Sequence, residues 1–397
     1  MKVLVFPHHL ELGGSQVNAI ELAAAGRDLH GHEVVLFATP GPALELVRKR
    51  GLRYVEAPAP RAHPSPSVMR ALLRAVRDER PDLVHAWDWP QCLDAFYGVH
   101  LARRMPLLAS NMSMGVTRFL PRSIPITYGT PELVETARRI RGGPVYLLEP
   151  PVDTQLNAPD ACDARPFLDA LGVAAGELVV VIVSRLVAWL KLDGVERAMH
   201  AAAELSADFP LRLVVVGGGP AAPRLEAVAS SVNARAGRTV VTLTGPMADP
   251  RPAYAAADVA LGMGGSALRA MAFGKPCIVL GEDGFSLPFT PETSSRFLWS
   301  GFYGAGQPDS GGLAAQLRTL LADPARRSEL GEYSRGVVEK RFSLTAGATT
   351  LNAAYQDTVA HDAARAELIV DAARTALQRL GGPLVPTALK RQLLSNR

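Results

Sequence analysis

Short apolar runs of strand length alternate with stretches of helical periodicity through most of this chain. In the first half these runs lie at residues 2–6, 33–38, 52–56, 83–86, 107–110, 124–128 and 145–148. A strand, a helix and a further strand in succession are typical of a parallel sheet with helices on both faces. The alternation therefore predicts an α/β protein built on doubly wound parallel sheets.

The alternation is interrupted once and then restarts. Glu149-Pro150-Pro151 opens a polar stretch that continues to residue 165 and has the composition of a linker. Apolar runs return at residues 178–183, 211–216, 240–243, 258–261 and 277–280. We predict two Rossmann-like domains, at residues 1–150 and 171–342, joined by a linker at 151–170 and followed by helices at 343–397. Ligands of such sheets bind beyond the carboxyl ends of the strands, so we expect a site in the cleft between the domains.

Charge and composition narrow the classes of partner. The 397 residues include 42 Lys and Arg against 38 Asp and Glu, a formal net charge of +4. This excess is too small and too dispersed to indicate nucleic acid. The start, MKVLVFPHHL, lacks a signal-peptide core, and no apolar run reaches the roughly 18 residues of a membrane span. We expect a cytoplasmic protein without membrane contact, and we expect Cys92, Cys162 and Cys277 to be buried free thiols.

The segment at residues 258–280 combines a strand, a glycine turn, a helix and a second strand. Gly262, Gly264 and Gly265 precede Ser266, and the helical run extends over residues 267–273. Glycines before a helix let backbone N–H groups approach a ligand, and the start of a helix favours an anion such as phosphate. An ordinary strand–turn–helix corner has the same pattern, so the segment alone leaves both interpretations open.

This segment resembles the donor site of the retaining GT-B glycosyltransferases of family 4. The family pattern is Glu, seven residues, Glu, Ala-Met-Ala, one residue, Gly, one residue and Pro. Ala270-Met271-Ala272-Phe273-Gly274-Lys275-Pro276 matches its second half, whereas Leu261 and Arg269 stand in place of the two glutamates. In the family, the second glutamate holds the donor ribose and the first lies near the transferred sugar.

The resemblance extends over residues 1 to about 355 and implies a fold. In GT-B proteins two Rossmann-like domains face a cleft, and a C-terminal helix crosses back to the first domain. The resemblance implies that residues 1–150 bind the acceptor and residues 171–342 bind the nucleotide-sugar donor. It also implies that the helices at 343–397 pack on the first domain.

Two cations follow the first strand of the second domain. Arg185 and Lys191 lie in a stretch that resembles the family's Gly-Arg-Leu…Lys-Gly segment, with Ser184 in the glycine position and one additional residue before the lysine. In the family these cations bind the donor diphosphate, which suits the negative charge that develops on a leaving diphosphate. The alternative is a pair of solvated surface charges.

Several glycine turns also resemble family segments near the nucleotide, although each is equally an ordinary tight turn when taken alone. For Gly13-Gly14-Ser15, the alternative is a turn with an N-cap serine.

We expect the side chain of Arg269 to point near the cleft, because Leu268, Met271 and Ala272 take the apolar face of its helix. The predicted donor-binding residues are Gly13, Gly14, Arg185, Lys191, Gly217, Gly219, Pro246, Gly264, Gly265, Ser266, Ala267, Leu268 and Arg269.

An aromatic segment follows the strand at residues 83–86. His85-Ala86-Trp87-Asp88-Trp89 resembles the family's acceptor-side His-x-x-Asp-Trp segment, which implies catalytic roles for His85 and Asp88. The two indole rings could offer flat apolar faces to a sugar. The alternative for His85 is a structural role, which is more common for a lone histidine at the end of a strand.

Together these features predict a transferase that moves a sugar from a nucleotide-diphosphate sugar to a hydroxyl-bearing small molecule or glycan. The resemblance implies retention of configuration, with no cofactor and no metal. The alternative is a GT-B protein that has lost catalysis and serves as a binding or scaffolding partner, because Leu261 and Arg269 replace both glutamates. Arg269 cannot accept hydrogen bonds from ribose hydroxyl groups, although it can bind an anion.

Overall fold

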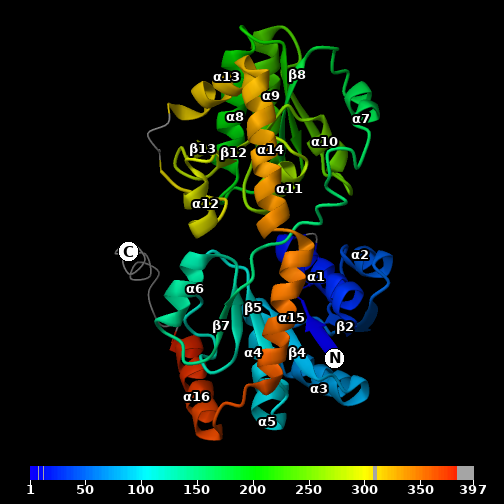
Figure 1. The fold of residues 1–397 in the computed structure, drawn as a ribbon, viewed down its shortest axis with the longest axis vertical. Coiled ribbons are helices and arrows are strands. Elements are labelled where there is room, and N and C mark those ends of the chain that lie inside the picture. The colour runs from blue at the N-terminus through cyan, green and yellow to red at the C-terminus, as the bar shows by residue number, and fades with distance from the viewer. Residues whose placement is uncertain (8, 12, 307–310, 382–397) are drawn as a thin grey trace. The chain divides into compact units, whose positions relative to one another are not determined.

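The computed structural model describes residues 1–7, 9–11, 13–306 and 311–381 of the 397 residues. The chain divides into two compact units (Figure 1). Unit 1 comprises Met1–Pro150 together with the chain from Leu344 onward, and unit 2 comprises Pro151–Ser343. Each unit is built around its own sheet, so the chain leaves unit 1, completes unit 2 and then returns.

Among the described residues of unit 1, seven parallel strands form a sheet in the order β3-β2-β1-β4-β5-β6-β7. The strands are β1 (Lys2–Phe6), β2 (Glu33–Ala38), β3 (Arg53–Glu56), β4 (Leu83–Trp87), β5 (Leu107–Asn111), β6 (Ile126–Tyr128) and β7 (Val145–Leu147). The helices are α1 (Gly14–His30), α2 (Leu44–Lys49), α3 (Pro66–Glu79), α4 (Asp88–Ala95), α5 (Leu101–Arg103), α6 (Pro131–Arg138), α15 (Leu344–Ala360) and α16 (Arg365–Gly381), with a π-helical turn η1 (Phe96–His100) between α4 and α5.

The sheet of unit 1 is buried on both faces. Successive side chains of a strand point to opposite faces. Leu4 therefore packs in one core with residues of α3 and α4, whereas Val3 and Val5 pack in another with α1 and α15. Because α15 lies beside α1 on this face (Figure 1), residues more than 300 positions apart in the chain share one core.

In the described part of unit 2, six strands form a sheet in the order β10-β9-β8-β11-β12-β13. The strands are β8 (Leu178–Val183), β9 (Leu211–Val216), β10 (Val241–Gly245), β11 (Val259–Gly262), β12 (Cys277–Leu280) and β13 (Ser286–Pro288). The helices are α7 (Arg165–Ala170), α8 (Leu192–Leu205), α9 (Ala222–Ala236), α10 (Arg251–Ala256), α11 (Gly265–Ala272), α12 (Ser294–Ser300), α13 (Gly312–Ala322) and α14 (Pro324–Arg341). Strands β8 to β12 are parallel, and β13 pairs antiparallel with β12.

The two doubly wound parallel sheets predicted from the alternation are confirmed, with two local differences. Strand β13 was not expected; it forms because the chain reverses after β12, where the N–H of Gly281 donates to the carbonyl oxygen of Phe285 at 3.0 Å. The stretch 151–170, predicted as a linker, includes α7, whose Phe167 and Leu168 pack against the core of unit 2. These two apolar residues fold the end of the stretch onto the sheet.

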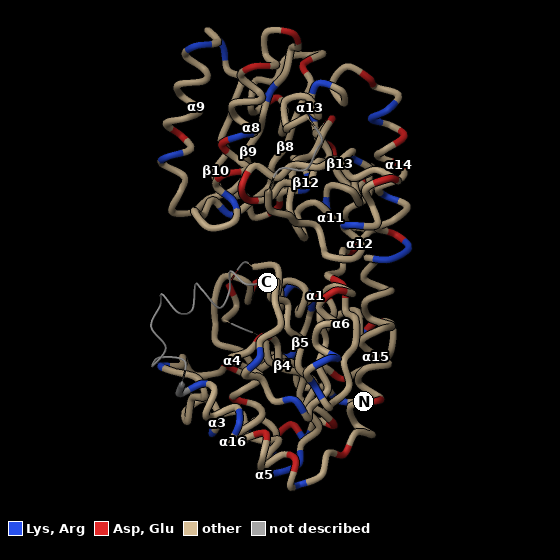
Figure 2. Tube along the Cα trace, turned by 90° about the vertical axis from the view of Figure 1, so that its left-hand side faces the viewer, with Lys and Arg blue, Asp and Glu red and all other residues tan. Residues whose placement is uncertain are grey.

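The distribution of charged residues and the burial of the cysteines follow the expectations from composition. Acidic and basic residues are interspersed along the helices of both units (Figure 2). Within the described ranges, no helix is both long enough and apolar enough to cross a bilayer. The three cysteines are free; Cys92 and Cys277 are buried as expected, and Cys162 is half-buried.

Candidate functional site

The carboxyl end of β8 carries the two predicted cations of unit 2. Arg185 is exposed in the loop after β8, and Lys191 is the half-buried N-cap residue of α8. The Lys191 ammonium lies 2.9 Å from the sulfur of Met263, which follows the neighbouring strand β11. Arg185 and Lys191 are close enough for their charges to interact. The structure thus brings together two residues from one loop and the end of an adjacent strand.

The electrostatic surroundings of Lys191 disfavour its positive charge. Burial, and secondarily the charge of Arg185, lower the pKa of Lys191 from its usual range to about 8. Its position at the start of α8 adds the partial positive charge of a helix N-terminus. Within the described residues, neither cation forms an ion pair with a carboxylate. A bound anion would relieve this repulsion, so the local electrostatics favour an anionic ligand.

Two predicted glycines allow the backbones of the loops after β8 and β9 to approach closely. A Cβ atom on Gly217 would lie 1.8 Å from the carbonyl oxygen of Ser184, and one on Gly219 would lie 2.4 Å from that of Leu186. Only glycine permits so close an approach of the two backbones. The next loop lies beside them, because a Cβ on Gly218 would be 3.2 Å from Cδ of Pro246. This packing explains the glycines; their predicted contact with a nucleotide stays a prediction.

The start of α11 contributes backbone groups. Gly264 is the N-cap residue, and Gly265, Ser266 and Ala267 form the first turn, whose N–H groups point out of the helix. The hydroxyl of Ser266 accepts from the N–H of Met263 at 3.2 Å and donates to its carbonyl oxygen at 3.0 Å. The side chain of Leu268 is buried, and its N–H donates to the carbonyl oxygen of Gly264. The predicted donor contact at Leu268, like those at the other residues of this turn, stays a prediction.

The two positions that lack the family glutamates differ in setting. Leu261 lies within β11, and its side chain is buried in the core of unit 2. Arg269 is half-buried on α11, and its guanidinium lies over the first turn, where Nη1 would be 3.2 Å from a Cβ placed on Gly265. Its charge also interacts electrostatically with the buried Tyr254. The side chain of Arg269 therefore points toward the helix start and not into the sheet.

In unit 1, Asp88 joins three segments at the carboxyl end of the sheet. Its carboxylate accepts from the hydroxyl of Ser15 at 2.7 Å and from the N–H of Met112 at 3.2 Å. Asp88 has φ of 63°, a conformation that is uncommon outside glycine. Ser15 follows the predicted Gly13-Gly14 pair, and Gly13 is the N-cap of α1. Asp88 thus fixes the start of α1 against the ends of β4 and β5; its predicted catalytic role stays a prediction.

His85 lies in the interior of unit 1. Its side chain is 0% exposed, and its ring nitrogens contact the hydroxyl groups of Tyr355 (2.8 Å) and Ser110 (2.7 Å). Ser110 in turn contacts Thr127 at 2.7 Å, so a polar chain runs from α15 through β4, β5 and β6. Burial lowers the pKa of His85 to about 3. These are the contacts of a neutral structural histidine, as in the alternative interpretation, and the predicted catalytic role stays a prediction.

The aromatic rings next to His85 are also less accessible than expected. Trp87 is 1% exposed, so the prediction that its face meets a sugar is wrong. Trp89 is half-buried, with the guanidinium of Arg379 lying 4.7 Å from its ring centre and the ring of Phe119 at 5.5 Å. The alternation of strand side chains directs Trp87 into the core beneath α1 and α15.

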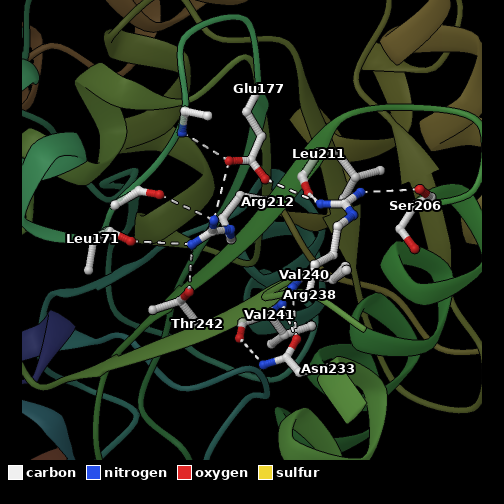
Figure 3. Close-up of polar contacts among 12 residues, drawn as sticks. Leu171, Glu177, Ser206, Leu211, Arg212, Asn233, Arg238, Val240, Val241 and Thr242 are labelled. Atoms are coloured by element: carbon white, nitrogen blue, oxygen red, sulfur yellow. Dashed lines mark hydrogen bonds and ion pairs between the residues drawn. The ribbon is translucent and has the colours of Figure 1, made fainter. Parts of the chain in front are cut away.

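The amino ends of β8 and β9 carry a second charged group, the Glu177 cluster, defined as Glu177, Arg212 and Arg238 (Figure 3). Glu177 accepts from Arg212 at 3.3 Å and from Arg238 at 3.4 Å. The side chains of Glu177 and Arg212 are 7% and 9% exposed. Arg212 also donates to the carbonyl oxygen of Leu171 and to the hydroxyl of Thr242. Apart from the exposed Arg238, this cluster is buried, and it lies at the end of the sheet opposite to Lys191.

Sequence reasoning did not identify several residues at these sites. Met263, Tyr355 and Ser110 were missed because their contacts join distant segments. Glu282 was missed as well; it follows β12 and accepts from the N–H of Leu190 at 3.1 Å. Within the described residues, no three His, Cys, Asp or Glu side chains gather as metal ligands. The expectation that no metal is required stays a prediction.

Two family models match the chain. The model described as "Glycosyl transferases group 1" matches residues 177–323, and that described as "Glycosyltransferase Family 4" matches residues 12–127. No curated protein sequence matches the chain.

Solved structures share the fold over most of the chain. A glycosyltransferase from Rickettsia africae has a TM-score of 0.71 at 13% identity, with 91% of this chain and 99% of that chain covered. HepE of Anabaena in complex with UDP-glucose has a TM-score of 0.70 at 16% identity, covering 90% and 100%. UDP-GlcNAc 2-epimerase from Neisseria meningitidis, bound to UDP-GlcNAc, has a TM-score of 0.62 at 13% identity, covering 90% and 100%. At such identities the likeness shows the fold alone.

Proposed function

The chain is a glycosyltransferase with the GT-B fold, and we propose that it transfers a sugar from a nucleotide-diphosphate sugar to a hydroxyl-bearing small molecule or glycan. We include retention of configuration at the anomeric carbon in the proposal. The observation that carries the donor assignment is the pair Arg185 and Lys191. Lys191 is half-buried, its pKa is lowered to about 8, and no carboxylate within the described residues neutralises it.

The surroundings of this pair suit a diphosphate. The loops after β9 and β10 and the first turn of α11 surround the end of β8 with glycine backbone, which admits a ligand closely. When a glycosyl–phosphate bond breaks, negative charge accumulates on the leaving diphosphate, and two cations fixed beside it would stabilise that charge. The UDP-glucose complex of HepE, a protein of the same fold, supports this class of donor.

Turnover of a nucleotide-sugar panel tests the proposal. The native protein is incubated with UDP-, GDP-, ADP- and dTDP-sugars and a set of simple glycoside acceptors, and release of nucleoside diphosphate is measured. Release from one donor, with an unchanged anomeric configuration in the product by NMR, supports transfer with retention. If no donor is turned over and none binds by calorimetry, the proposal is wrong.

A second candidate function is binding without turnover. The observation that favours it is the replacement of both family glutamates, by the buried Leu261 and by the cation Arg269. Arg269→Glu separates the two functions. If the site has lost its donor, the new carboxylate can accept hydrogen bonds from ribose hydroxyl groups, and binding should improve. If the native site binds its donor by using Arg269, the variant should bind UDP- and GDP-sugars no more tightly than the native protein.

A further inference from the structure

The loop between β8 and α8 presents an indole ring to solvent. Trp189 is 70% exposed, whereas Leu186 in the same loop is 1% exposed and Leu190 packs against the core of unit 2. A tryptophan leaves a large apolar surface in water when it is not packed. The loop therefore packs its two leucines on the core and leaves its largest apolar side chain exposed to solvent.

The position of Trp189 is held on both sides. Before it, the N–H of Leu186 donates to the carbonyl oxygen of Gly218 at 3.0 Å. After it, the N–H of Lys191 donates to the carbonyl oxygen of Trp189 at 2.9 Å across Leu190, whose φ is 69°. A three-residue turn with positive φ at its centre is rare and strained. The carboxylate of Glu282 holds this turn by accepting from the N–H of Leu190 at 3.1 Å.

The tight turn brings Trp189 close to Lys191, the cation that we propose binds the diphosphate. Two residues separated by one in the chain have Cα atoms within about 7 Å of each other, and the turn shortens this distance. Strained backbone that the surrounding structure maintains is typical of functional sites. Here the strained turn holds the backbone of an exposed tryptophan close to that of Lys191, whose charge lacks a carboxylate partner within the described ranges.

We propose that Trp189 packs its indole face against the sugar ring of the donor. The inference rests on the proposed function, in which Arg185 and Lys191 bind the diphosphate. The transferred sugar and the ribose are both bonded directly to that diphosphate, whereas the base is separated from it by the ribose, so these two sugar rings are within reach of a residue next to Lys191. A pyranose ring has a face of C–H groups, which suits the apolar face of an indole. Trp189 would therefore distinguish a nucleotide sugar from the free nucleotide.

The test compares ligand pairs that differ by the sugar. UDP with UDP-glucose, and GDP with GDP-mannose, are titrated into the native protein, Trp189→Ala and Trp189→Phe by calorimetry. Pairs of aromatic rings contribute about 0.5–1.5 kcal/mol, and a contact of similar strength here corresponds to about a 2- to 12-fold loss of affinity. We expect this loss for the nucleotide sugar in Trp189→Ala, an unchanged affinity for the free nucleotide, and a smaller loss in Trp189→Phe. Trp299→Ala, at a tryptophan of α12 that is 46% exposed, should change neither affinity.

Other outcomes overturn the inference in distinguishable ways. An equal loss for UDP and UDP-glucose would place Trp189 against the nucleotide. An effect only on the KM of the acceptor, with donor affinity unchanged, would place it against the acceptor. If the native protein binds the donor and Trp189→Ala binds it equally well, this inference fails while the proposed function stands. If the native protein binds none of the four ligands, and none of the ADP- and dTDP-sugars of the wider panel, both fail.

Discussion

The two ends of the sheet in unit 2 carry charged side chains in opposite circumstances. At the amino ends of the strands, Glu177 accepts from Arg212 and Arg238, so the two buried charges, those of Glu177 and Arg212, are paired within the protein. At the carboxyl ends, Arg185 and Lys191 repel each other, and the pKa of Lys191 is lowered to about 8. A charge that is paired within the protein indicates a structural role, whereas a charge without such a partner indicates a group that binds a ligand of opposite charge.

The comparison predicts that the two ends respond differently to mutation. Loss of a charge from the Glu177 cluster should lower stability and leave ligand binding unchanged. Loss of the charge of Arg185 or Lys191 should lower ligand affinity and leave stability unchanged. Four experiments examine this contrast, in order of decreasing effect.

The largest effect is expected from Glu177→Ala. The substitution leaves Arg212 buried without its anionic partner, which typically costs about 3–5 kcal/mol in the free energy of unfolding. Urea denaturation of the native protein and the variant measures this change. Glu332→Ala, which removes an exposed carboxylate from α14, is the matched control and should change stability by less than about 0.5 kcal/mol. A loss below about 1 kcal/mol in Glu177→Ala would contradict a structural role for the cluster.

The second effect concerns affinity. Arg185→Ala and Lys191→Ala should each weaken binding of a nucleoside diphosphate by about 1.5–3 kcal/mol, the range for hydrogen bonds to charged groups. The free energy of unfolding should not fall in Lys191→Ala, because the lowered pKa means that folding disfavours the charged amine. Lys340→Ala, at an exposed lysine of α14, is the control for loss of a positive charge from unit 2. Native affinity in both variants would remove this site from consideration.

The third effect is the pH dependence of binding. Below the pKa of about 8 Lys191 is charged, and nucleoside diphosphate affinity should be constant. As the pH rises above this value the free protein loses the proton that the bound state retains, so affinity should fall by about tenfold between pH 7 and pH 9. Lys191→Arg stays charged throughout and should bind with little pH dependence. A native profile that stays flat to pH 10 would show that Lys191 does not contact the anion.

The smallest effect extends the comparison to unit 1. There the polar side chains around His85 form hydrogen bonds within the protein, as those of the Glu177 cluster do. Tyr355→Phe removes the hydroxyl that contacts His85 and leaves one buried ring nitrogen without that partner. We expect the free energy of unfolding to fall by about 1 kcal/mol, with nucleoside diphosphate affinity unchanged. Tyr333→Phe is the control, because the hydroxyl of Tyr333 forms no hydrogen bond within the part of the chain that the structure describes. A change in affinity without a change in stability would indicate that His85 acts at the site.

The fold was predictable because its signal is local. Apolar runs of four to six residues, such as β8 and β9, indicate a parallel sheet when they alternate with helices along the chain. The placement of Arg185 and Lys191 was predictable for the same reason, since residues that follow a strand lie at its carboxyl end. The short α7 and the edge strand β13 were not predictable, because each is stabilised by packing or pairing with segments already in place.

Local patterns in the chain therefore specify the two parallel sheets and the end of the second sheet at which Arg185 and Lys191 lie. Which polar side chains find partners within the protein depends instead on contacts between distant segments. His85 is neutral and enclosed because Tyr355, 270 residues later, reaches its ring. Lys191 remains without a carboxylate partner in the described residues because the neighbouring strand brings the sulfur of Met263 to it. The physical reason is that the free energy of a polar group depends on the partners and the solvent around it, and distant parts of the chain supply both.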